Sequence, residues 1–268
     1  MESIIQEAFF ANDLIAKQNH YHDCHQILFV RNGIIELGLG EETRICRSGD
    51  IIILSRYGHH YIDIISDIYE RYIVRLNPFV LSKLQGREFS LFLNRPTAEK
   101  NIFSVKGDTS PYERVFNSII AETKTSDDFS GEMQQLLINQ LMIMIYRINT
   151  TLLTPIYEAE KFRMIFNIQK ELENNCQEQY TLEGLAKKYH TSVSTLSHQF
   201  KKITGFSVFE YLFLCRIAYA KYMLTRTDYS IGDIVERIGF SDSSNFSRTF
   251  KSTVGMTPSQ FRVKYKEA

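Results

Sequence analysis

The feature that most constrains the fold of this chain is a pattern that occurs twice in its last third, about 50 residues apart. The second copy is GFSDSSNFSRTFKSTVG at 239–255, and the first is SVSTLSHQFKKITG at 192–205. Each copy has two large apolar residues four apart, which lie on one face of a helix. The aligned pairs are Leu196 with Phe246, Phe200 with Phe250, Lys201 with Lys251, and Gly205 with Gly255. Such a repeat predicts two supersecondary units.

A shorter amphipathic helix precedes each copy. Its apolar positions are Leu182, Leu185, Ala186 and Tyr189 before the first copy and Ile231, Ile234, Val235 and Ile238 before the second. A helix, a tight turn and a second helix form the helix-turn-helix unit. The second unit begins at Ser230–Asp233, which is typical of a capping box. A long helix at 207–227 joins the units, and we expect it to hold their second helices about one DNA turn, ~34 Å, apart.

The second helix of each unit has a polar face that suits the major groove of DNA. In the second unit this face consists of Ser243, Ser244, Asn245, Ser247 and Arg248. Arg and Asn can form paired hydrogen bonds with base edges, and Ser can donate or accept one. An ordinary amphipathic surface helix would explain one such face by itself. The presence of a second copy favours DNA recognition.

Residues 160–265 resemble the DNA-binding domain of the AraC/XylS family of bacterial transcription regulators. The resemblance rests on Gly239-Phe240, Asn245–Arg248, Phe250-Lys251, Gly255, Thr257–Ser259 and Phe261-Arg262. One departure is Val235, because the family usually has Ala at this tightly packed position. The resemblance implies an all-α domain with two helix-turn-helix motifs.

The resemblance also implies roles for individual residues. The expected base contacts are Ser194, Ser197 and His198 in the first motif and Ser243, Ser244, Asn245 and Arg248 in the second. The expected phosphate contacts are Lys201, Lys202, Lys251 and Arg262; such contacts position a protein without reading sequence. Arg248 is the foremost candidate, because Arg bound to guanine is the commonest specific contact. The alternative for Arg248 is an intramolecular salt bridge, which holds an exposed side chain only weakly.

Charge is unevenly distributed along the chain, although its 268 residues include 31 Lys and Arg and 31 Asp and Glu. Residues 157–268 carry 16 basic and 12 acidic side chains, whereas residues 1–156 carry 15 and 19. This asymmetry is typical of one nucleic-acid-binding domain joined to a domain of another kind. The excess is small, so we expect ordinary, salt-sensitive affinity for non-specific DNA.

Cysteine usage and hydropathy indicate a cytoplasmic protein without a membrane span. The cysteines are Cys24, Cys46, Cys176 and Cys215, and they show neither CxxC pairs nor zinc spacing. We expect reduced thiols rather than disulfides. The N-terminal segment has no basic region and no long apolar run, so no signal peptide is predicted. The apolar stretches are too short to cross a bilayer.

The N-terminal half is predicted to be a β-barrel or sandwich. Apolar runs between turn residues indicate strands at 26–30, 34–39, 43–46, 51–54 and 69–76, after an apolar strand or arm within 1–19. Asn32-Gly33 is a hairpin signal. Many short strands with regular turns are typical of these architectures.

This half resembles a cupin-type barrel, the sensor domain of many AraC/XylS members. The resemblance rests on the order His-x-His, strand, Asn-Gly turn, strand, Gly-Asp, strand, His. Some cupins bind a metal with such histidines, and His20 and His22 could join His59 or His60 in a three-histidine site. Gln26 stands near where a metal cupin offers Glu, so we expect no metal and no cofactor. The expected effector-binding residues are His20, His22, His25 and His60; the alternative is that these histidines are simply exposed.

Two helices are predicted after the barrel, at 112–120 and 131–149. The stripe of the second helix is Met133, Leu136, Leu137, Gln140, Leu141, Met144, Ile145 and Ile148, broadened by Ile138, Met142 and Ile143. A helix that is apolar over so much of its circumference packs against two partners. We expect these to be the barrel and, as the dimers of the family imply, the same helix of a second subunit. Burial within one subunit is the alternative.

The sequence thus predicts an α+β protein of two domains. Residues 1–150 are expected to form a cupin-like barrel with a helical pair, which binds an effector and dimerises through the 111–149 helices. Residues 157–268 are expected to form the double helix-turn-helix domain, after a short linker at 150–155. Short segments at 79–84 and 89–94 are expected to be a helix and a helix or barrel strand.

The expected function is sequence-specific transcription regulation, as an activator that binds promoter DNA and responds to a small molecule such as a sugar or other metabolite. RNA polymerase is a further candidate partner. We recognise no nucleophile triad, phosphate loop or carboxylate pair, so no enzymatic activity is expected. Two alternatives remain open: a metal-dependent cupin enzyme with an accessory DNA-binding tail, and a regulator whose barrel binds no small molecule.

Overall fold

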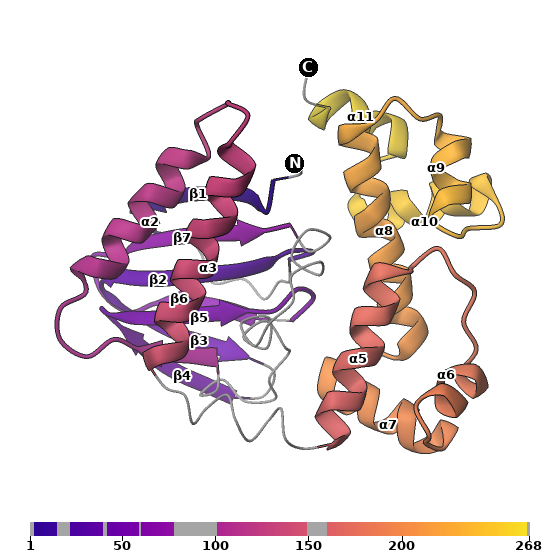
Figure 1. Cartoon of the computed structure of the whole chain (residues 1–268), viewed down its shortest axis with the longest axis horizontal. Helices are drawn as coiled ribbons and strands as arrows, with labels where there is room; N and C mark the ends of the chain where they lie inside the picture. Colours follow the sequence, from indigo (N-terminus) through magenta and orange to yellow (C-terminus); the bar gives the residue numbers. More distant parts are fainter. Residues whose placement is uncertain are drawn as a thin grey trace. The chain divides into compact units, whose positions relative to one another are not determined.

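The chain folds into two compact units, Met1–Arg163 and Met164–Ala268. The computed structural model describes residues 3–14, 22–39, 42–58, 60–77, 101–148 and 160–266. The segments expected at 79–84, 89–94 and 150–155 lie outside these ranges, as do His20 and His59. Figure 1 shows sheets with two covering helices in the first unit and a group of helices in the second.

Two antiparallel sheets form the body of the first unit. Their strand orders are β1-β7-β2-β5-β8 and β4-β3-β6. The strands are β1 (Ile5–Ala11), β2 (His25–Asn32), β3 (Ile34–Leu39), β4 (Glu42–Arg47), β5 (Asp50–Leu54), β6 (His60–Ile64), β7 (Glu70–Leu76) and β8 (Ile102–Ser104). The predicted strands within this set are confirmed.

The sequence prediction missed β6 and β8. The β6 sequence, HYIDI, mixes polar and apolar residues over five positions, and β8 has only three residues. Each is held by a neighbouring strand: Ile62 pairs with Leu37 of β3, and Phe103 pairs with Ile51 of β5. Short strands of this kind depend on tertiary pairing more than on local pattern.

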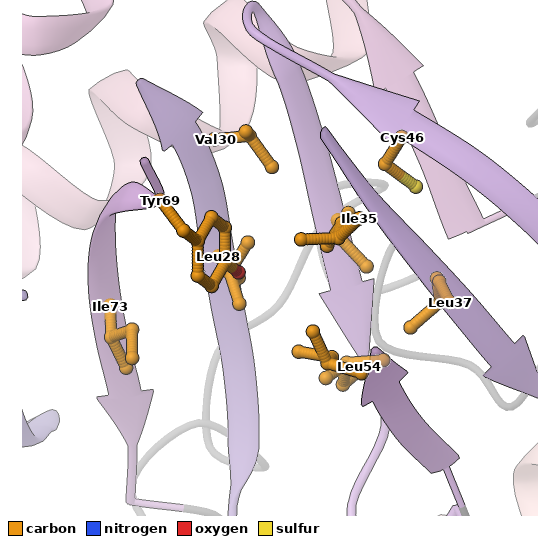
Figure 2. Close-up of a cluster of buried hydrophobic side chains, with 10 residues drawn as sticks. Leu28, Val30, Ile35, Leu37, Cys46, Leu54, Tyr69 and Ile73 are labelled. Carbon is orange, nitrogen blue, oxygen red and sulfur yellow. The ribbon is translucent and has the colours of Figure 1, made fainter. Parts of the chain in front are cut away.

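The core of the first unit lies between the two sheets. Side chains from both sheets point into the same space in Figure 2. The buried residues are Leu28, Val30, Ile35, Leu37, Cys46, Ile52, Leu54, Ile62, Tyr69 and Ile73. Because successive residues of a strand face opposite sides, this set uses every second position of β2 and β3.

Helices α2 (Ser110–Glu122) and α3 (Ser130–Ile148) lie on the outer face of the larger sheet (Figure 1). Phe29 and Tyr72 alternate with the inward-facing residues and point toward these helices. Phe116 of α2 stacks on both, with ring centroids 5.5 Å from Phe29 and 5.4 Å from Tyr72. The sheet is therefore buried on both faces.

The apolar stripe predicted for α3 is placed differently in the structure. The buried face consists of Ser130, Gln134, Ile138, Leu141, Met142 and Ile145. Ile138 and Met142, which the sequence suggested only as a broadening of the stripe, lie at its centre. Met133, Leu136 and Ile143 face outward and are exposed. The prediction could not separate the two faces, because both are rich in Leu, Ile and Met.

The second unit is arranged along one long helix, α8 (Val208–Arg226). Figure 1 shows α5, α6 and α7 toward one end of α8 and α9, α10 and α11 toward the other. The bounds are α5 (Glu160–Asn174), α6 (Leu182–Lys188), α7 (Val193–Thr204), α9 (Ile231–Arg237), α10 (Ser243–Val254) and α11 (Pro258–Tyr265). No single described helix is long and apolar enough to cross a membrane, although α7 and α8 meet that test when counted together as a bent pair.

The aromatic residues of α10 anchor the second motif. Phe246 and Phe250 are fully buried in a cluster with Leu224 of α8, Ile234 of α9 and Phe261 of α11. The Phe250 and Phe261 rings meet edge to face, with centroids 5.7 Å apart. One side of α10 is thus committed to the core, and the opposite side stays in solvent.

We predict that Phe250→Ala lowers the free energy of unfolding of the full chain by about 3–5 kcal/mol, because it leaves a cavity in this cluster. The matched control is Phe209→Ala, since the Phe209 side chain is 46% exposed and lies on α8 of the same unit. Urea unfolding followed by circular dichroism measures both. Equal losses for the two variants would contradict the assignment of Phe250 to the core.

Candidate nucleic-acid interface

The first helix-turn-helix motif consists of α6, a tight turn and α7. The turn passes through His190, whose φ of 51° is left-handed. The backbone N–H of Thr191 donates to the Ala186 carbonyl at 2.9 Å, which closes the end of α6. Ser192 then starts α7, because its hydroxyl accepts from the Thr195 N–H at 3.1 Å.

The second motif, α9 and α10, repeats this geometry. Gly239 occupies the left-handed position with a φ of 76°, and the Phe240 N–H donates to the Val235 carbonyl at 3.1 Å. Asp242 caps α10, accepting from the N–H groups of Ser244 and Asn245 at 3.1 and 2.7 Å. The two motifs therefore share the same turn, although their turn residues differ.

The repeat continues beyond the second helix of each motif. Gly205 and Gly255 both have a φ of 82° and end α7 and α10. Capping boxes follow, formed by Ser207 with Glu210 and by Thr257 with Gln260. A third capping box at Ser230 and Asp233 confirms the predicted start of α9. The repeat therefore extends from each motif into the start of the helix that follows it.

The residues predicted to contact bases lie together on the outer faces of α7 and α10. Ser194 and His198 are exposed on α7, and Ser197 is half-buried. Ser243, Ser244, Asn245 and Arg248 are all exposed on α10. The Arg248 guanidinium donates from Nη2 to Asn245 Oδ1 at 3.2 Å. This hydrogen bond joins two of the predicted base contacts and involves no carboxylate.

The residues predicted to contact phosphates are less uniform. Lys201, Lys202 and Lys251 are exposed at the ends of α7 and α10. Arg262 on α11 is half-buried, and its Nη2 donates to the Tyr229 carbonyl at 2.5 Å. Its guanidinium therefore already secures the loop between α8 and α9.

One position on this surface was missed from the sequence. Ser252 is exposed one turn beyond Arg248, as Lys202 is one turn beyond His198. The offset of 50 residues between the motifs aligns Ser252 with Lys202 and could have identified it. The outer face of α10 thus has fewer positive charges at its C-terminal end than that of α7.

The histidines proposed for effector binding gather at one end of the first unit. His25 and His60 are buried and His22 is half-buried. The rings of His22 and His60 lie 5.1 Å apart between centroids, and His60 Nδ1 is 2.9 Å from the Gly58 carbonyl oxygen. The backbone N–H of Arg56 donates to His25 Nδ1 at 3.2 Å. His22 and His60, two of the residues expected at the effector site, therefore lie close together, and His25 contacts the backbone of Arg56.

Two further residues at this end were not predicted. Arg56 and Tyr57 are both buried, and Arg56 Nη2 donates to the Tyr57 hydroxyl at 2.5 Å. The Arg56 guanidinium also lies over the Tyr57 ring, 4.5 Å from its centroid. Tyr57 has a left-handed φ of 63°, which is unusual for a bulky side chain. Within the described ranges, no group of three or more His, Cys, Asp or Glu is arranged to hold a metal ion.

Burial, and secondarily the positive charge of Arg56, lowers the pKa of His25 well below its ordinary value of 6.5. Neutral His25 is consistent with Nδ1 accepting a hydrogen bond, because a protonated ring has no acceptor. The folded protein thus excludes a proton that the unfolded chain takes up as the pH falls below about 6.5.

We predict that this linkage weakens the first unit on acidification, by up to about 1.4 kcal/mol per pH unit below pH ~6.5. In His25→Gln, where the side chain cannot be protonated, the fall in melting temperature between about pH 7 and pH 5 should be shallower. Scanning calorimetry of both full chains measures the difference. Parallel curves for the two proteins would contradict the prediction.

Comparison with known proteins identifies relatives of this chain. A family model described as a helix-turn-helix domain matches residues 185–264, from within α6 of the first motif to the end of the second and beyond it. YdiP of Escherichia coli, named an uncharacterised HTH-type transcriptional regulator, is 26% identical over 253 residues, covering 92% of this chain and 82% of YdiP. The transcriptional activator RhaR of Enterobacter is 30% identical over 154 residues. That match covers 58% of this chain and only about half, 54%, of RhaR.

A solved structure has a fold similar to that of the whole chain. The structure of ToxT from Vibrio cholerae, solved with an unsaturated fatty acid bound, matches over 100% of both chains with a TM-score of 0.55 and 16% identity. At this identity the likeness concerns the fold: an N-terminal β-sheet unit followed by a helical unit. The chain is therefore similar to HTH-type transcriptional regulators, and its residues 185–264 match a helix-turn-helix domain.

Proposed function

We propose that this regulator reads a two-part promoter site with α7 and α10, each in its own major groove. The observation that carries the proposal is the repeated motif with matching turns and caps, which presents an exposed polar face twice. The 19 residues of α8 rise about 28 Å. This length is comparable with one DNA turn of ~34 Å, so both helices can approach the same side of a duplex.

Base reading is assigned to Arg248, Asn245, Ser244 and Ser243 on α10 and to Ser194, Ser197 and His198 on α7. Arg248 and Asn245 have the donors and acceptors for paired contacts with guanine and adenine. The short serines of α7 favour contacts through water. Lys201, Lys202 and Lys251 are assigned to phosphates. Arg262 is also assigned to a phosphate, although its Nη2 already donates to the Tyr229 carbonyl.

Residues 1–150 are proposed to sense a small molecule, such as a sugar or other metabolite, and residues 157–268 to bind DNA. Two observations support a ligand for the first domain. The core between its sheets is apolar, and His25, His60 and Arg56 are buried, with His25 bonded to the Arg56 backbone. In addition, the similar ToxT structure contains a bound fatty acid. A ligand that favours one arrangement of the protein would shift its affinity for DNA.

The chain is proposed to act in the cytoplasm, without catalytic activity, as an activator. The support comes from its relatives, since RhaR is named an activator and YdiP a regulator. Activation would involve contact with RNA polymerase as well as promoter DNA. The metal-dependent alternative predicts near-stoichiometric metal in the purified protein, which elemental analysis would detect.

We further propose a homodimer in which α3 contributes the interface. Its outer face carries Met133, Leu136 and Ile143 at spacings of three and seven residues, with Leu136 62% exposed. Neighbouring Gln140 and Arg147 complete a seam of the kind that pairs helices. A face this apolar on a surface helix is typical of an interaction site.

The test of DNA recognition is selection of bound sequences from random duplex DNA by the purified full chain at near-physiological salt. Enrichment of a site with two parts in successive major grooves would support the function. If nothing is enriched, repeating the selection with residues 157–268 distinguishes a missing effector from motifs that do not read DNA.

We predict that Arg248→Ala weakens binding to the selected site by about 1–3 kcal/mol and relaxes base preference at one position. Lys251→Ala, in contrast, should weaken binding to all sequences alike and reduce the salt slope by about 1. Fluorescence anisotropy with selected and scrambled duplexes at several salt concentrations measures both. Equal loss for Arg248→Ala on scrambled DNA would rule out its base-reading role.

We also predict that replacing Leu136 by Asp converts the dimer into a monomer, because a carboxylate would be buried at the interface. The control is Ile68→Asp, since Ile68 is also exposed, at 58%, but lies in the turn before β7. Sedimentation equilibrium of the full chains gives the association state. A dimer that survives the Leu136 change, or dissociates equally with the control, would place the interface elsewhere.

A further inference from the structure

The second helix-turn-helix motif touches the segment that leads into the first, at a point away from both reading helices. This segment is the loop 175–180, between α5 and α6, and it meets the turn 238–241 of the second motif. Gln179 Nε2 donates to the Gly239 carbonyl at 3.2 Å. The second motif is therefore held by more than its covalent connection through α8.

Arg216, at the middle of α8, joins the same two segments. Its Nε donates to the Cys176 carbonyl at 2.7 Å and its Nη2 to the Glu178 carbonyl at 2.9 Å. The guanidinium carbon lies 5.8 Å from the centroid of the Phe240 ring, within the range of a cation–π contact. One side chain thus fixes the loop that precedes the first motif and packs on the turn of the second.

The loop 175–180 approaches Gly239 so closely that a side chain would not fit there. A Cβ at 239 would lie 2.4 Å from the Gln177 carbonyl oxygen and 3.0 Å from Arg216 Nη2. The left-handed backbone does not by itself demand glycine, because His190 occupies the matching position in the first motif. What excludes a side chain at 239 is the neighbouring loop.

The contact leads directly to the reading helix. The Phe240 ring meets the ring of Phe246 edge to face, with centroids 5.4 Å apart. It meets Phe213 of α8 in the same manner at 6.2 Å. Phe246 is fully buried on the inner side of α10. Displacement of Phe240 would therefore tilt α10 relative to α8.

We propose that Arg216, Gln179 and Gly239 form an inter-motif contact that sets the orientation of α10 relative to α7, and with it the spacing of the two DNA half-sites that the protein accepts. These are positioning residues, which act through Phe240 and touch no base. The proposal rests on the proposed function, since it concerns how the two reading helices are matched to one duplex. Two linked modules bind more tightly when their geometry already fits both sites.

The first test uses three duplexes derived from the selected site: the intact site, a site with the α10 half scrambled, and a site with one base pair inserted between the halves. An inserted base pair shifts the second half by ~3.4 Å and about one-tenth of a turn. The full chain is compared with Arg216→Met, which keeps the length of the side chain but loses its donors and charge.

Arg216→Met should lose about tenfold in affinity for the intact site and less than about twofold for the half-scrambled site. The penalty for the inserted base pair should be smaller than in the parent, because the orientation of α10 is less fixed. Equal losses on the intact and half-scrambled duplexes would indicate a general structural role and overturn the proposal, as would unchanged binding to both.

A matched glycine pair keeps the test decisive if Arg216→Met fails to fold. Gly239→Ala and Gly255→Ala introduce the same side chain at similar φ values of 76° and 82°, but a Cβ at 255 has open space around it. Both lie within the second motif and incur similar backbone strain. Only Gly239→Ala should reduce the affinity ratio between intact and half-scrambled duplexes; the same ratio in both variants would contradict the proposal.

Hydrogen exchange without DNA gives an independent result. In Arg216→Met, exchange should accelerate at both 175–180 and 238–241, because each segment loses the same partner. Unchanged exchange at either segment would overturn the inter-motif contact even if the parent selects no DNA. Conversely, accelerated exchange with no DNA selected by the parent would support the contact and count against the proposed function.

Discussion

The burial of one apolar stripe on each reading helix is the interaction on which the second unit depends. Phe246 and Phe250 on α10, like Leu196 and Phe200 on α7, are fully buried. Removing this apolar surface from water stabilises the unit and fixes how each helix rotates about its axis. The opposite face, which includes Arg248 and Asn245, is exposed as a consequence. Core packing and DNA recognition are thus two sides of the same helix.

The same principle of opposed faces organises the first unit. Along β2, Leu28 and Val30 face the second sheet, whereas Phe29 faces α2. Helix α3 continues the arrangement outward, since Ile138 and Met142 are buried and Leu136 and Ile143 remain exposed. The unit has one more apolar face than it can bury by itself. This surplus is the physical basis of the proposed dimer.

Polar side chains make specific contacts at one place in each unit. In the first unit, His25, Arg56 and His60 are among the buried polar side chains. In the second unit, Arg216 and Gln179 join the second motif to the loop that precedes the first. Burying a polar group is costly unless it finds a partner, so the positions of His25, Arg56 and His60 are strongly defined by the surrounding backbone. These contacts connect the proposed ligand site and the proposed DNA-reading helices to the backbone around them.

Much of this protein follows from local sequence patterns. Helix periodicity and helix caps are local properties, because they depend on residues close together in the chain. The sequence therefore predicts the doubled motif, its capping residues at 230–233 and the exposed faces of α7 and α10. The strands β2 to β5 and β7 follow from alternation and turn residues in the same way. Other features depend on segments that are distant in sequence. They are the strands β6 and β8, the choice between the two apolar faces of α3, and the approach of Gln177 to Gly239. Only the tertiary structure decided them, because a strand pairing, a buried face or a close backbone contact exists only when its partner is in place.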